Sequence, residues 1–166
     1  MSEGQVAALL LWLVLLAFSL NASLLRTLHA NPLYQHLCLG SAIVLVPLWT
    51  LRAGLHEGLE IHFLGLTSLT LLLGWRLALL APCLTLLILG AFGVTDLAEF
   101  GWQALIGVAL PVATSWLLFL ASWAWLPRHL FVYLFVAAFL GGALSISVKI
   151  LASALLMGMS GAYPWH

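Results

Sequence analysis

The sequence predicts an all-α, polytopic membrane protein, a bundle of about six transmembrane helices with its N-terminus outside. Of its 166 residues, 64% are hydrophobic and 6% are charged, whereas soluble proteins carry roughly 25% charged residues. The apolar residues gather in long runs, and a helix needs about 20 such residues to cross a bilayer. The runs lack the period-two alternation of barrel strands. Lipid is therefore the expected solvent.

Six runs are predicted to form helices within one integral membrane domain, residues 1–166. These runs are residues 5–25, 36–52, 59–75, 77–94, 103–126 and 130–158. The first run follows Glu3 and has no basic leader, so we interpret it as a retained helix and not as a signal peptide. The third and fourth runs are short and meet at Gly74-Trp75-Arg76. For either of these helices, a tilted, a broken and a partly re-entrant arrangement are all open interpretations.

Charge asymmetry predicts the orientation. With six spans, Arg26, Arg76 and Arg128 share one side, which the positive-inside rule assigns to the cytoplasm. The N-terminus is then outside. All five carboxylates fall on the outer side, and they are Glu3, Glu57, Glu60, Asp96 and Glu99. Arg52 is the one basic residue that departs from this pattern.

One outer loop, with the sequence GLHEGLEIHF, is rich in possible metal ligands. It contains His56, Glu60 and His62, and imidazole and carboxylate groups are ligands for divalent cations. The alternative is that a loop in water simply carries polar residues. The loop composition alone leaves both interpretations open.

Lys149 lies well inside the sixth run. A charge at bilayer depth is costly, so an intramembrane lysine is a functional candidate. Alternatively, its long stem reaches an interface. Small residues precede it, including Gly141, Gly142 and Ser145, and such residues allow close helix contacts within the chain or with a partner.

Several function classes are excluded. Five basic residues balance five acidic ones, which argues against nucleic-acid binding. No GxSxG, HExxH, P-loop or GxGxxG pattern occurs, so we expect neither an enzyme nor an organic cofactor. Cys38 and Cys83 sit in apolar runs without metal-type spacing and are expected to be buried.

Several short stretches, taken in order, carry a family resemblance. They are GSAIVLVPLWTLRAG from residue 40, His62-Phe63-Leu64-Gly65 with LTSLTLLLGW after it, Gly93-Val94-Thr95-Asp96-Leu97, Leu110-Pro111, and PRHLFVYLFVAAFLGGAL from residue 127. Together they resemble the membrane-embedded substrate-binding subunits of energy-coupling-factor transporters for cobalt and nickel, the CbiM/NikM group. The last stretch is similar to the proteobacterial branch of that group.

The resemblance implies a metal site rich in nitrogen ligands. In the family, the ligands are the N-terminal amine, a histidine at position two and the histidine of the His-Leu-Leu-Gly segment. Only the last carries over, to His62, because position two is Ser2 here. We expect His56, Glu60 and the Met1 amine to complete the ligand set, with Asp96 orienting an imidazole.

The resemblance also implies a function. The chain would bind a divalent transition metal (nickel or cobalt, with copper and zinc as alternatives) from the outer face of a bacterial inner membrane, as a multi-pass subunit. It would reside in the lipid bilayer and would work with a partner permease and with ATPases. The alternative is a non-catalytic accessory subunit of a larger membrane complex. An intramembrane enzyme would need paired catalytic groups that the sequence does not offer.

Overall fold

The computed structural model describes residues 3–50, 65–95, 99–125, 129, 131 and 133–159, and every regular element within them is helical. This confirms an all-helical membrane bundle. Four helices are long and apolar enough to span a membrane, and a bent pair near the N-terminus would make a fifth span. The four are Pro32–Thr50, Leu66–Ala91, Phe100–Trp125 and Phe135–Leu156.

The first predicted helix, residues 5–25, is divided in two. Helix α1 spans Glu3–Ser19, and α2 spans Ala22–Ala30. The axes of the two differ by 63°. Asn21 has an extended backbone between them, and its side-chain oxygen accepts a hydrogen bond from the Leu24 N–H at 3.1 Å. The break therefore lies where an asparagine caps a new helix instead of continuing the old one.

Helix α3 spans Pro32–Thr50 and begins four residues before the predicted run 36–52. Proline suits the first turn of a helix because the N–H it lacks would have no partner there. Pro47 lies inside α3. Residues 51–64, which include the start of the predicted run 59–75, lie outside the described part of the chain.

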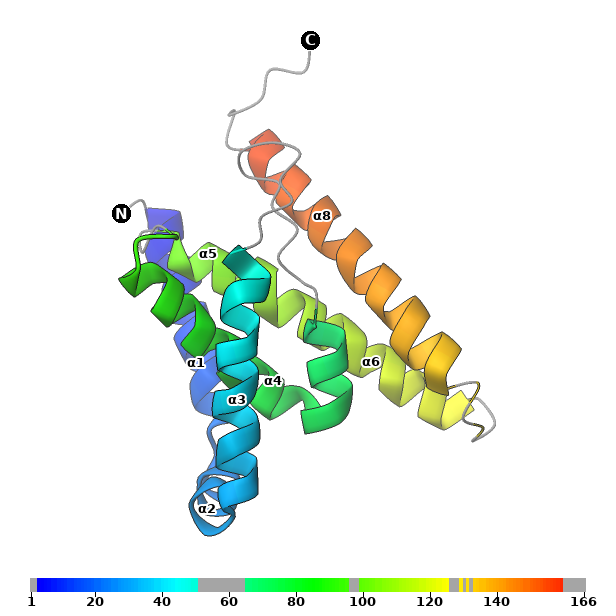
Figure 1. Ribbon diagram of the computed structural model, residues 1–166. Helices are drawn as coiled ribbons and strands as arrows, with labels where there is room; N and C mark the ends of the chain where they lie inside the picture. The colour runs from blue at the N-terminus through cyan, green and yellow to red at the C-terminus, as the bar shows by residue number, and fades with distance from the viewer. Residues whose placement is uncertain are drawn as a thin grey trace.

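Helix α4 spans Leu66–Ala91 and covers the remainder of the predicted runs 59–75 and 77–94. Gly74 interrupts it with φ 79° and ψ 162°, a conformation that glycine adopts without a steric penalty. The junction expected at Gly74-Trp75-Arg76 is therefore a sharp kink within one element. Figure 1 shows the two parts of α4, teal and green, running in different directions.

The last two predicted helices contain π-helical segments. Run 103–126 corresponds to α5 (Phe100–Ala104), η1 (Leu105–Ala109) and α6 (Leu110–Trp125). Pro111 has no N–H to donate to the carbonyl of Gly107, so a widened turn just before it is expected. Run 130–158 corresponds to η2 (Tyr133–Leu140) and α8 (Gly141–Met159).

Helix α4 lies in the middle of the bundle. It packs against α3, α6 and α1, and α8 packs against α6. Apolar side chains that point away from these contacts, such as Leu72, Phe92 and Phe139, are largely exposed, as expected for a surface that lipid covers. In Figure 1 the start of α1, the end of α3 and α5 lie toward the top, and α2 lies at the bottom.

Candidate functional site

The predicted metal ligands lie outside the described residues. This holds for Met1, His56, Glu60 and His62, and also for Asp96. Among the residues that the structure describes, no group of three or more His, Cys, Asp or Glu side chains could hold a metal ion. The structure instead shows how the described residues that flank these segments are held.

Gly65 anchors the end of the segment that carries His62. Its φ of 107° lies in the left-handed region, which favours glycine. Its carbonyl accepts the first hydrogen bond of α4, from the Leu69 N–H at 2.8 Å. A Cβ at this position would lie 3.4 Å from Leu45 Cδ2 of α3 and 3.8 Å from Leu48 Cδ2. The chain three residues after His62 is thus fixed against the second half of α3.

The start of α1 is held by a close crossing with α5. A Cβ on Gly101 would lie only 2.7 Å from the Leu9 backbone nitrogen, closer than real side chains allow. Gly101 is also buried. Near the beginning of α1, a Cβ on Gly4 would lie 3.7 Å from the Trp102 ring. Glycine therefore lets the two backbones touch, close to the segment that contains Met1.

The loop that carries Asp96 begins at a glycine cap. At the end of α4, the Gly93 N–H donates to the Gly90 carbonyl at 3.1 Å and the Val94 N–H donates to the Leu89 carbonyl at 2.9 Å. Gly93 has φ 69°, the left-handed geometry that commonly ends a helix. Helix α5 begins at Phe100 and packs against α1, so the end of α4 and α5 lie at the same end of the bundle as the start of α1 (Figure 1).

A chain of buried hydroxyl groups joins three helices, and the sequence analysis did not anticipate it. Ser115 of α6 is 3.0 Å from the Thr67 hydroxyl of α4 and 2.7 Å from the Ser145 hydroxyl of α8. Ser145 also donates to the Gly141 carbonyl at 2.8 Å. The only signal in the sequence was the presence of hydroxyl side chains in otherwise apolar runs. Which of them meet depends on how the helices pack.

Lys149 lies on the same face of α8 as Ser145, one turn further along. Its side chain is 9% exposed. Gly141, Ser145 and Lys149 recur every four residues, and all three are buried. This pattern places the lysine toward α4 and α6 and not toward lipid, which favours the interpretation that it lies inside the bundle.

Arg76 lies at the other end of the bundle, where α2 and the kink of α4 meet. Its Nη1 donates to Asn21 Oδ1 at 3.3 Å, and its carbonyl accepts from the Ser19 hydroxyl at 3.3 Å. Its guanidinium lies over the Trp75 ring, 5.2 Å from the ring centroid, and Trp75 stacks on Phe18. The kink of α4 is thus tied to the break between α1 and α2.

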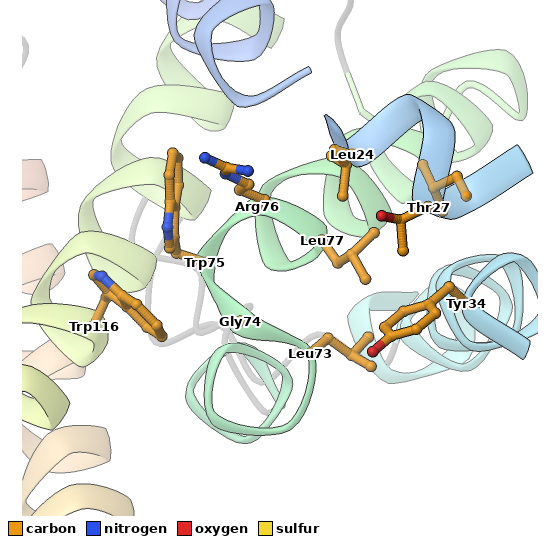
Figure 2. A pocket seen from close by; sticks show the side chains of 10 residues that line it. Leu24, Thr27, Tyr34, Leu73, Gly74, Trp75, Arg76, Leu77 and Trp116 are labelled. Carbon is orange, nitrogen blue, oxygen red and sulfur yellow. The ribbon is translucent and has the colours of Figure 1, made fainter. Parts of the chain in front are cut away.

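A pocket of about 270 Å³ opens beside this arginine (Figure 2). It is lined by Leu24, Thr27, Leu28, Tyr34, Leu73, Gly74, Trp75, Arg76, Leu77 and Trp116. The lining is apolar and aromatic, apart from the Thr27 and Tyr34 hydroxyls and the guanidinium.

Comparison with known protein families gives one match. The family model for CbiM, the cobalt uptake substrate-specific transmembrane region, matches residues 2–166. Neither the comparison with curated proteins nor that with solved structures gave a match. The match includes every stretch that carries the family resemblance. It also agrees with the multi-pass helical architecture. The chain therefore belongs to the CbiM family of cobalt uptake membrane components.

Proposed function

We propose that this chain binds a divalent transition-metal ion, cobalt or nickel, at the end of the bundle where α1 begins, and delivers it inward with a separate permease and ATPases. The observation that carries the proposal is the family match over residues 2–166. Nitrogen ligands suit these ions and also copper and zinc. His62 is the anchor ligand in this proposal, with His56, Glu60 and the Met1 amine as further ligands and Asp96 orienting an imidazole.

The described geometry supports a site at this end. Gly65, three residues after His62, lies against α3, and the close approach of Gly101 to Leu9 holds α1 against α5. The carboxylates of Glu3 and Glu99 flank the same two helices, since Glu3 begins α1 and Glu99 precedes α5. Negative charge near the entrance would raise the local concentration of cations.

Orientation follows from the same arrangement. Arg26 and Arg76 lie in α2 and at the α4 kink, away from α5. The positive-inside rule puts that arginine-bearing end in the cytoplasm. The proposed site then faces outward, as uptake requires. The bundle carries no nucleotide-binding pattern, so energy would come from partner subunits.

The test is elemental analysis of the purified chain, combined with cobalt and nickel titration at neutral pH. The wild type should bind one metal ion, and His62→Ala should lose it while the protein still elutes as a folded species. His56→Ala and Glu60→Ala should weaken binding less than His62→Ala. Even a residue that only orients a ligand typically contributes about 10–100-fold in affinity.

His129→Ala is the matched control. His129 is exposed and is expected on the opposite side of the membrane, so its loss should leave metal binding unchanged. A wild type that contains no transition metal and gains none on titration would contradict the proposal. In that case an accessory subunit of a larger membrane complex becomes the better interpretation.

A further inference from the structure

The pocket beside Arg76 has no role in the proposed metal site. It lies at the end of the bundle opposite α5, where α2, the start of α3, the α4 kink and α6 converge (Figure 2). Its volume of about 270 Å³ is close to the lower end of ligand pockets, roughly 300–1,000 Å³. Its described lining lies away from α5 and the start of α1, so an occupant here would be separate from an ion bound at that other end.

The lining fits an amphiphilic ligand, which has both an apolar part and a charged part. Leu24, Leu73 and Leu77 form an apolar wall, and Arg76 is the one charged side chain among the lining residues. A free hydrophilic anion would satisfy the guanidinium but would leave the apolar wall uncovered. An acyl chain joined to an anionic group would satisfy both.

The position of the pocket favours a lipid over a soluble ligand. Trp75, Trp116 and Tyr34 border it, and tryptophan and tyrosine mark the level of the lipid headgroups. Helix α2 has the character of an interfacial helix: Leu24 and Leu28 pack against the core, while Arg26 is exposed. A short helix with one apolar and one basic face lies in the plane of a membrane surface.

Charge complementarity determines the headgroup. The described carboxylates are Glu3 and Glu99, which lie at the α1–α5 end, whereas Arg26 and Arg76 lie at this end. A guanidinium has five N–H donors in a planar fork that matches the oxygens of a phosphate. The hydrogen bond from Arg76 Nη1 to Asn21 Oδ1 at 3.3 Å fixes the direction of the side chain. The site thus presents an oriented cation at the depth of the phosphates.

We infer that this pocket binds one anionic phospholipid, with its phosphate on Arg76 and an acyl chain against Leu73 and Leu77. The bound lipid covers the notch that the Asn21 break and the Gly74 kink leave in the bundle surface. The inference is independent of metal binding, since the described lining residues lie at the end of the bundle opposite α5.

Lipid binding can be measured by native mass spectrometry in neutral detergent, with phosphatidylglycerol and phosphatidylcholine of identical acyl chains. Both lipids offer a phosphate to Arg76, but the choline cation of phosphatidylcholine cancels the net negative charge that the guanidinium attracts. The wild type should therefore retain one phosphatidylglycerol about tenfold more tightly than phosphatidylcholine. Arg76→Gln should abolish this preference. Arg26→Gln is the matched control, because it removes a cation from the same end without altering the lining, and it should keep the preference.

Two further variants test the site if Arg76→Gln fails to fold. Arg76→Lys keeps the charge and should keep a preference for phosphatidylglycerol. Leu73→Trp adds bulk to the apolar wall and should release both lipids. Equal binding of the two lipids by the wild type, equal loss of preference in Arg26→Gln and Arg76→Gln, or full lipid retention by Leu73→Trp would each overturn the inference. Any of those outcomes would mean that the protein surface attracts lipids only diffusely, without a defined site.

Discussion

The two ends of the bundle are built in different ways. At the α1–α5 end, Gly101 and Gly65 bring backbones and helix ends into close contact. At the opposite end, the chain bends at Asn21 and Gly74, and Arg76 with stacked aromatic rings fills part of the space between the bends. Close backbone packing suits a site for a small ion that must be held rigidly. A loosely filled, apolar and cationic notch suits an amphiphile.

The contrast shows that helix breaks carry different roles in one membrane protein. Irregular backbone is tolerated at membrane depth only where other groups satisfy the freed polar atoms. At Asn21 the side chain itself caps the next helix. Around Arg76 the carbonyl of the kink accepts a hydroxyl from Ser19. Both bends are therefore stabilised from within the chain, and the pocket lies where they meet.

The largest expected effect is an all-or-none difference in accessibility between the two ends. Cysteines introduced as Glu99→Cys and His29→Cys occupy exposed positions near α5 and in α2. The first should react with an impermeant thiol reagent added to intact cells, and the second should react only after the membrane is opened. The native Cys38 and Cys83 are buried and should give little background. The reverse pattern of labelling would invert the orientation and the proposed uptake direction.

Gly101→Val should disrupt the α1–α5 end more than any other single glycine change described here. A Cβ at this position would meet the Leu9 backbone nitrogen at 2.7 Å, so a helix must move. Overpacking typically costs about 1–3 kcal/mol, and contact with backbone favours the upper end of that range. The free energy of unfolding can be measured by denaturant titration in detergent, and metal affinity should fall with it.

Gly40→Val is the matched control for this prediction. Gly40 also lies in a helix, and a Cβ there would meet nothing within 4 Å. Its substitution should change the free energy of unfolding by no more than about 0.5 kcal/mol. Equal destabilisation by the two variants would show that loss of a flexible glycine, and not the close crossing, sets the effect.

How much of this architecture was predictable depends on how local its causes are. A tight junction between two short helices was expected at Gly74-Trp75-Arg76, and the structure shows a kink there inside the single element α4. The break at Asn21 was not expected, since it depends on whether one side chain caps a new helix or faces outward within the old one. The contact between Gly101 and Leu9 joins distant parts of the chain and leaves no signal in either segment alone.

The candidate metal site came from a different kind of information. Residue spacing alone left the histidine-rich outer loop open to two interpretations, and only the family resemblance singled out His62. The family match supports that resemblance, while the roles of His56, Glu60, His62 and Met1 stay predictions. The lipid pocket could not be predicted, because α2, α4 and α6 enclose it only after the chain bends twice.

Replacement of Lys149 should have an intermediate effect. The side chain is buried on the face of α8 that carries Ser145, so Lys149→Ala would remove a group that the surrounding bundle accommodates and would leave polar neighbours without it. We expect a loss of about 2 kcal/mol in the free energy of unfolding, within the range for an uncompensated buried polar group. An unchanged free energy and unchanged metal uptake would instead favour a lysine that reaches the membrane interface.

The smallest expected effect concerns the buried hydroxyl chain. Ser145→Ala removes the contact with Ser115 at 2.7 Å between α8 and α6, and hydrogen bonds between membrane helices contribute about 0.6 kcal/mol on average. Ser147→Ala is the matched control, because the exposed Ser147 bonds only to the Ala143 carbonyl in its own helix. Ser145→Ala should therefore lower the free energy of unfolding by more than Ser147→Ala does.

A double-mutant cycle that combines Ser145→Ala with Ser115→Ala should give a coupling free energy of similar size, because each single change already breaks the shared bond. A coupling of zero would mean that Ser145 is stabilised by its own helix, through the Gly141 carbonyl, and that the hydroxyl chain does not hold α6 and α8 together.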